Sequence, residues 1–179
     1  MDLEALRYPV GKYHYPDTVS DQLKKEWIND ITTFPEKLAA VVKGLSEEQL
    51  EWHYRPDGWT IRQVVHHCAD SHLNAIIRFK LALTEDNPTI KPYLEHLWAK
   101  LSDVQNDIDD SLQILTGLHK KWTTIITNLT EDELARTYIH PEHGKTFNLK
   151  FTIGMYAWHC RHHYAHVLQA IEHKGDFNS

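Results

Sequence analysis

Three capping-box motifs divide this chain into segments with helical periodicity. Ser46, Thr60 and Thr130 are each followed three residues later by Gln or Glu, a spacing in which the hydroxyl caps one backbone amide and the later side chain caps another. Apolar residues at helical spacing predict four long helices, at residues 21–43, 61–83, 111–129 and 149–173. The pattern therefore predicts an all-α fold, a four-helix bundle with short extra helices.

The segments between these helices predict a long crossover and little sheet. Residues 91–100 should form a short helix inside the crossover between the second and third long helices, and residues 136–147 hold the one candidate for extended structure. Pro35 should kink the first helix or open a new turn. A chain of 179 residues can bury about 68–70% of its unfolded surface. We therefore expect residues 1–179 to form a single domain.

Composition narrows the class of function. The net charge is -6 and no cluster of Lys and Arg is present, so we expect no binding to nucleic acid, whose backbone attracts basic patches. The chain has no run of about 18 apolar residues and no signal-peptide pattern, which predicts a cytoplasmic protein with no membrane association. Cys68 and Cys160 lie in predicted helices and are expected to be buried thiols rather than a disulfide.

Histidine, the commonest metal ligand, is abundant: the chain has 14, and four of them lie in the segment WHCRHHYAH. Residues four apart on a helix share a face, so His159 pairs with His163 and His162 pairs with His166. His159, His163 and His166 flank the apolar stripe of the last helix. His162 and His173 are expected on its polar face.

A zinc-like site needs three protein ligands when one position is left to water, so another helix must contribute. The second long helix offers His66, His67 and His72. Helical periodicity places His66 on the far side of the apolar face but does not choose between His67 and His72. From periodicity alone, a metal site and a set of hydrogen-bonded core histidines both stay open.

Two motifs at these histidines resemble the signatures of the DinB-like superfamily of metal-binding four-helix bundles. In DGWTIRQVVHHCADSH, a Trp and a Thr open the second helix and a ligand histidine follows the Trp by eight residues, which here is His67. HCRHHYAH is similar to the second signature, H-x-x-x-H on the last helix, which maps to His159 and His163. The segments YPVGKY, HYRPDGWT, IRFKLALTEDNPTIKPY and HPE resemble the YfiT branch, and the likeness covers essentially the whole chain.

The resemblance implies one divalent metal ion per chain, bound by His67, His159 and His163 with the remaining positions left to water. Zn²⁺ is the first expectation and Ni²⁺ the alternative, since imidazole suits both. Because the YfiT branch is described as metal-dependent hydrolases, we expect hydrolysis of an unidentified small molecule. A related reaction stays open, in which the same metal activates the thiol bacillithiol for transfer to an electrophile. A homodimer is also implied, and Leu73 and Ile77 lie off the main apolar stripe.

An alternative class is a non-catalytic metal-binding or sensing module, in which His72 or His166 would complete a closed set of ligands. Metal-bound imidazoles normally donate their second N–H to a nearby acceptor, which makes Asp70, Ser71, Asn74 and His166 candidates to support the ligands. Many superfamily members carry Gln at the position of His166. The sequence identifies no general acid or base, so the catalytic group is expected to be metal-bound water or thiolate.

Overall fold

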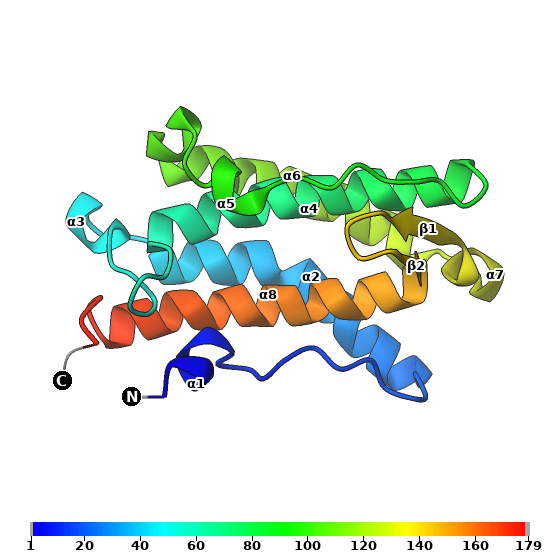
Figure 1. Cartoon of the computed structure of the whole chain (residues 1–179), viewed down its shortest axis with the longest axis horizontal. Helices are drawn as coiled ribbons and strands as arrows, with labels where there is room; N and C mark the ends of the chain where they lie inside the picture. The colour runs from blue at the N-terminus through cyan, green and yellow to red at the C-terminus, as the bar shows by residue number, and fades with distance from the viewer. Residues whose placement is uncertain (1, 178–179) are drawn as a thin grey trace.

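Four long helices form the main body of the computed structural model, which describes residues 2–177 (Figure 1). They are α2 (Asp21–Val42), α4 (Ile61–Thr84), α6 (Ile108–Thr127) and α8 (Leu149–Glu172). Their bounds differ from the expected ranges by three residues at most. The predicted all-α four-helix bundle is therefore confirmed.

Short capped helices connect the long ones. All three capping boxes form with both of their hydrogen bonds, and they start α3 (Glu47–Leu50), α4 and α7 (Glu131–Ala135). The crossover between α4 and α6 contains α5 (Glu95–Trp98) and the 3₁₀ helix η1 (Ser102–Gln105), in the region where a short helix was expected. The first helix of the chain, α1 (Leu3–Arg7), was not expected.

A two-stranded hairpin lies between α7 and α8, in the segment expected to be extended. Strand β1 (Thr137–His140) pairs antiparallel with β2 (Lys145–Asn148), with Thr137 opposite Asn148. Gly144 in the turn has a φ of 59°, which glycine adopts without the steric cost that a Cβ would bring. The side chain of Asn148 caps the first turn of α8, so the hairpin leads directly into that helix.

The first two long helices, α2 and α4, lie at opposite corners of the bundle, and so do the last two, α6 and α8. Both α8 and α6 pack against α2 and α4, so α2 is diagonal to α4 and α6 is diagonal to α8. Figure 1 shows α8 running beside α2, with α4 above it. The result is a direct seam between α4 and α8, although residues 85–148 separate the two helices in the sequence.

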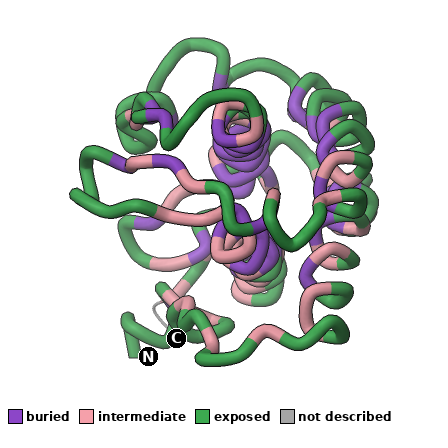
Figure 2. Tube along the Cα trace, turned by 90° about the vertical axis from the view of Figure 1, so that its right-hand side faces the viewer, coloured by how far each residue is buried: buried purple, intermediate pink, exposed green. Residues whose placement is uncertain are grey.

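The core lies where the four apolar stripes meet, and Figure 2 shows its buried positions facing the interior of the bundle. Each long helix contributes to the largest fully buried side chains, among them Phe34, Phe79, Trp122 and Ile153. Removing such side chains from water stabilises the fold by about 1.5–3 kcal/mol each. Within the described chain, no helix combines the length and the apolarity needed to span a bilayer.

Candidate metal centre

Three histidines from two helices converge on one point at the seam between α4 and α8. His67 comes from α4, and His159 and His163 come from successive turns of α8. One nitrogen of each ring lies within 4.8 Å of a nitrogen of both others, and Nε2 of His67 is 3.3 Å from Nε2 of His159. The structure therefore brings together the three residues that the family resemblance singled out.

The arrangement of these nitrogens suits a divalent metal ion. Two nitrogens bound tetrahedrally to zinc at about 2.0–2.1 Å lie roughly 3.3 Å apart, which agrees with the separation between His67 and His159. In addition, Nδ1 of His163 is buried without a hydrogen-bond partner among the described residues, so no protein hydrogen bond occupies this nitrogen. A set of three imidazole nitrogens suits zinc and nickel alike.

Desolvation keeps these rings in the neutral form that binds metal. Burial, with a smaller contribution from the nearby His162, lowers the pKa of His67 to about 4. Burial, followed by the neighbouring imidazoles, holds the pKa of His159 and of His163 well below the usual range of histidine. Because a protonated imidazole cannot coordinate, the three rings are ready to bind metal at neutral pH.

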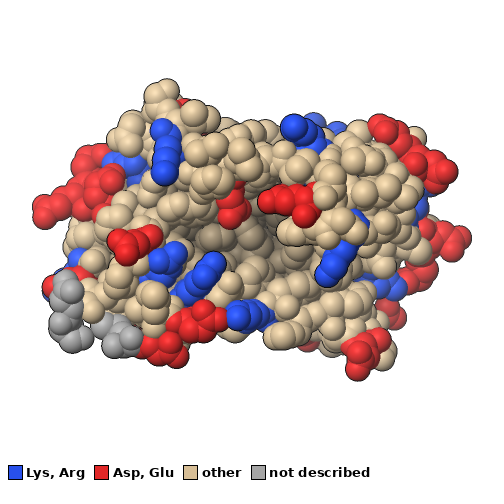
Figure 3. Space-filling view, in the orientation of Figure 1, with Lys and Arg blue, Asp and Glu red and all other residues tan. Residues whose placement is uncertain are grey.

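Two adjoining hollows give access to this point. One, of about 310 Å³, is lined by Tyr8, Tyr54 and Trp59 together with the three histidines. The other, of about 290 Å³, extends toward the hairpin. Glu95, Trp158 and His159 line both hollows, so the two meet beside the candidate metal site. Figure 3 shows this face of the molecule hollowed between α4 and α8.

The second hollow contains a buried cation. Arg78 is 8% exposed, its Nε has no hydrogen-bond partner, and no ion pair within the described residues includes it. Its Nη1 lies 3.4 Å from the hydroxyl of Tyr156. His140 lines the same hollow, and its buried Nδ1 also lacks a partner among the described residues. A buried charge without a counter-charge is costly, so this hollow favours an anionic group.

The expected supporting residues do not all reach the ligands. Oγ of Ser71 lies 3.5 Å from Nε2 of His159, at the limit of a hydrogen bond. Asn74 instead donates to the backbone carbonyl of Asp70, and within residues 2–177 no hydrogen bond joins either residue to the three imidazoles. The ring of His166 packs near that of His163, with centroids 5.4 Å apart, but its Nε2 contacts the carbonyl of Arg7 on α1 and its ring stacks on Tyr54.

Two other histidines support the centre from behind. Nε2 of His72 lies 3.0 Å from Nδ1 of His159, and Nδ1 of His72 lies 2.8 Å from Nε2 of His119. Periodicity left His72 open as a ligand, whereas the structure places it against the opposite edge of the His159 ring from His67. His119 was missed, although its spacing from the apolar residues Leu118 and Trp122 on α6 indicated a buried position.

The remaining histidines lie outside the cluster. His66, as expected, points away from the seam, where its Nδ1 lies 2.8 Å from Oγ of Ser111. The expectation that His162 lies on the polar face was wrong, since this residue is only 7% exposed. Its ring stacks on Trp158 and lies near Tyr8, because the N-terminal segment covers this side of α8.

Comparisons with known proteins identify the family of this chain. The family model described as the DinB superfamily matches residues 30–167. A protein of Bacillus mycoides (strain KBAB4) is 48% identical over 95% of this chain and 98% of its own length, and one of Bacillus cereus (strain B4264) is 49% identical over 92% and 95%. Both are named "putative metal-dependent hydrolase".

A solved structure is also similar over nearly the whole chain. YfiT from Bacillus subtilis, described as "a probable metal-dependent hydrolase with an unusual four-helix bundle topology", superposes with a TM-score of 0.91 at 41% identity. The match covers 96% of this chain and 98% of YfiT. The diagonal placement of α2 and α4, and of α6 and α8, distinguishes this chain from a bundle in which each helix packs against the next.

Proposed function

This chain belongs to the DinB superfamily, and from that premise we propose that it is a metal-dependent hydrolase of a small molecule, with His67, His159 and His163 binding one divalent ion per chain. The convergence of the three ring nitrogens carries the proposal. The names of its relatives support the hydrolase assignment. Zn²⁺ is the proposed ion, with Ni²⁺ as the alternative that the same ligands would accept.

The residues around the site have different proposed roles in catalysis. When bound, a divalent ion with a free coordination position lowers the pKa of water to about 7 and polarises a carbonyl. The neutral imidazoles hold the position of the ion, and the aromatic walls formed by Tyr54 and Trp59 exclude bulk water and pack against the apolar part of a substrate. No side chain in the hollows is assigned as general acid or base.

The second hollow supports a substrate that carries a carboxylate or phosphate group. Arg78 offers a buried guanidinium without a counter-charge, and His140 offers a buried ring nitrogen without a partner among the described residues. Glu95 and Glu142 line the same hollow, but both are exposed. An anionic group on the substrate would neutralise the Arg78 charge and place the rest of the molecule beside His159.

A second candidate is transfer of a low-molecular-weight thiol such as bacillithiol. Burial raises the pKa of Cys68 and of Cys160, both of which are free thiols, so the chain's own cysteines stay protonated and a thiolate must come from a co-substrate. Incubation of metal-loaded protein with bacillithiol and an electrophilic dye separates the reactions. Conjugate formation favours the transferase, and loss of a labile ester or amide without thiol favours the hydrolase.

A closed, non-catalytic metal site has less support. Such a site needs a fourth protein ligand, and His72 already contacts Nδ1 of His159 rather than the point where the three nitrogens meet. His166 is held by Arg7 and Tyr54. X-ray absorption on metal-loaded protein tests this alternative, because a catalytic site predicts three nitrogens and an exchangeable oxygen.

We also propose that two copies associate through the face formed by α4 and α5. This face exposes large apolar side chains at 43–55% of their surface: Leu73, Ile77, Leu94, Leu97 and Leu101. Exposed apolar patches of this kind mark interaction surfaces. Light scattering after gel filtration should give twice the mass of one chain, and Ile77→Asp should give a single chain.

The direct test of the proposed function is activity against small esters and amides that carry an anionic group. Protein purified without a histidine tag should contain one divalent ion per chain and lose hydrolysis when a chelator removes that ion. His163→Ala should remove both properties, whereas His173→Ala, which changes a histidine of the same C-terminal segment outside the cluster, should keep both. Absence of stoichiometric metal in the parent protein would overturn the proposal.

A further inference from the structure

A chain of hydrogen bonds crosses all four long helices behind the candidate metal centre. It runs from Nδ1 of His159 on α8 to His72 on α4, then to His119 on α6, and ends at the backbone carbonyl of Ile31 on α2. The three separations are 3.0, 2.8 and 2.6 Å. His72 is fully buried and His119 is 2% exposed. The diagonal order of the helices makes this path possible, since it follows neighbouring pairs at every step.

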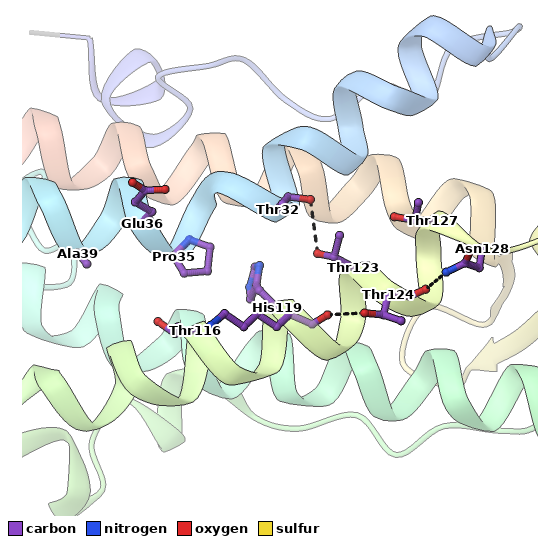
Figure 4. A pocket seen from close by; sticks show the side chains of 11 residues that line it. Thr32, Pro35, Glu36, Ala39, Thr116, His119, Thr123, Thr124, Thr127 and Asn128 are labelled. Carbon is purple, nitrogen blue, oxygen red and sulfur yellow. Dashed lines mark hydrogen bonds between the residues drawn. The ribbon is translucent and has the colours of Figure 1, made fainter.

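Pro35 explains why the carbonyl of Ile31 is available. In a regular helix this carbonyl would accept a hydrogen bond from the amide four residues later, but proline has no N–H. Nδ1 of His119 takes its place at 2.6 Å. Figure 4 shows His119 rising from α6 toward the turn of α2 that contains Pro35. The proline inside α2 thus creates an acceptor at the point where α6 presents an imidazole.

The acceptor at Ile31 determines which nitrogen carries the proton on each of the three imidazole rings. A carbonyl only accepts, so Nδ1 of His119 carries the proton and Nε2 of a neutral His119 is an acceptor. His72 must then donate from Nδ1, which leaves its own Nε2 as the acceptor for Nδ1–H of His159. The outcome is a bare Nε2 on His159, the nitrogen that faces His67.

We propose that Pro35, His119 and His72 act as positioning residues that fix the tautomer and orientation of His159, so that its Nε2 lone pair is ready for the metal ion. This inference rests on the proposed metal site, but it concerns a property of the protein that exists before metal binds. Metal ligands are commonly oriented by a partner on the second ring nitrogen, and loss of that partner typically weakens metal binding 10- to 100-fold.

The packing around these hydrogen-bonded histidines holds them rigidly and excludes water. The ring of His72 lies between Phe34, Trp122 and Tyr156, with centroid separations of 5.3, 5.9 and 5.5 Å. Such close aromatic neighbours leave little freedom for the imidazole to rotate. Burial lowers the pKa of His119 to about 4, so the ring is neutral at pH 7 and keeps one bare nitrogen.

A purely structural role would also satisfy these buried polar groups, but it predicts different behaviour. In that case the tautomer of His159 is indifferent to residue 119, and loss of His119 changes stability without changing metal affinity. A matched control exists on the same helix pair, because His66 on α4 lies 2.8 Å from Ser111 on α6 without touching a candidate ligand.

The test combines nitrogen NMR of the metal-free protein with zinc affinity. Spectra of ¹⁵N-histidine-labelled protein should show His159 protonated at Nδ1 and bare at Nε2. His119→Leu should weaken zinc binding, measured against a competing chelator, by about 10- to 100-fold. His119→Gln, whose amide can donate to Ile31 and accept from His72, should restore the affinity to within about threefold, and His66→Leu should leave it unchanged.

The outcomes separate this inference from the proposed function. A wild-type His159 protonated at Nε2 in the metal-free protein overturns the inference, whether or not zinc binds. Equal affinity of wild type and His119→Leu, or an equal loss in His66→Leu, also overturns it. A wild-type protein that shows the expected tautomers but binds no zinc instead contradicts the proposed function. The NMR measurement needs no variant, so it decides even where His119→Leu does not fold.

Discussion

The neighbouring residues His66 and His67 offer a sharp test, because the structure gives them separate roles on opposite sides of α4. His67 is one of the three converging histidines, and His66 is 7% exposed and lies 2.8 Å from Oγ of Ser111. At a free zinc concentration of about 1,000 times Kd, binding stabilises the folded state by about 4.1 kcal/mol. For a chain of this length, each kcal/mol of stabilisation raises the Tm by about 2–4 °C, so zinc binding should raise the Tm by roughly 8–16 °C.

His67→Ala should remove this zinc-dependent rise, because one of only three ligands is lost. His66→Ala should instead leave a buried hydroxyl unpaired and a small cavity, at a cost of about 2 kcal/mol, which lowers the Tm of the metal-free protein by roughly 4–8 °C. The zinc-dependent rise should remain in that variant. Calorimetry with zinc and with a chelator measures both quantities. Retention of the full rise in His67→Ala, or its loss in His66→Ala, would refute the assignment.

Three further predictions concern the interior. Because the pKa of His119 is lowered to about 4 in the folded state against about 6.5 when unfolded, the unfolded state takes up the proton first as the pH falls. Because of this residue, the free energy of unfolding should therefore fall by about 1.4 kcal/mol for each unit that the pH falls between 6.5 and 4. Denaturant titrations of His119→Gln at a series of pH values should show a pH dependence of this free energy that is weaker by the same amount. Gly154→Ala should lower stability by about 1–3 kcal/mol, because the added Cβ would lie 2.8 Å from the Trp27 ring, and zinc affinity should not change. An unchanged midpoint of chemical denaturation would contradict this packing. Pro35→Ala supplies an amide that competes for the Ile31 carbonyl, so zinc binding measured with a competing chelator should weaken, and unaltered binding would argue that His119 does not depend on that carbonyl.

The sequence predicted the helices well because their signals are local. A capping box lies within four residues, and an apolar stripe needs only one helix to be recognised. The topology is a different matter, since the diagonal placement of α2 and α4 depends on contacts between distant segments. That placement decides which histidines meet.

The candidate site was predictable only in part for the same reason. His67 and His72 are both buried on α4, so periodicity could not separate them, and the family resemblance favoured His67. His119 was missed because its partner is a backbone carbonyl on another helix, which carries no side-chain signature. His162 was misplaced because the periodicity of α8 alone does not reveal that the segment around Tyr8 covers its outer face.

The central claim is that imidazoles from α4 and α8 bind one ion between them. Anomalous diffraction at the zinc absorption edge, from crystals of protein purified without a tag and loaded with one equivalent of zinc, tests it most directly. The account predicts one anomalous peak per chain, within about 2.0–2.1 Å of a nitrogen from each of His67, His159 and His163. A peak elsewhere would contradict it. So would the absence of a peak, with the three rings hydrogen-bonded only to one another.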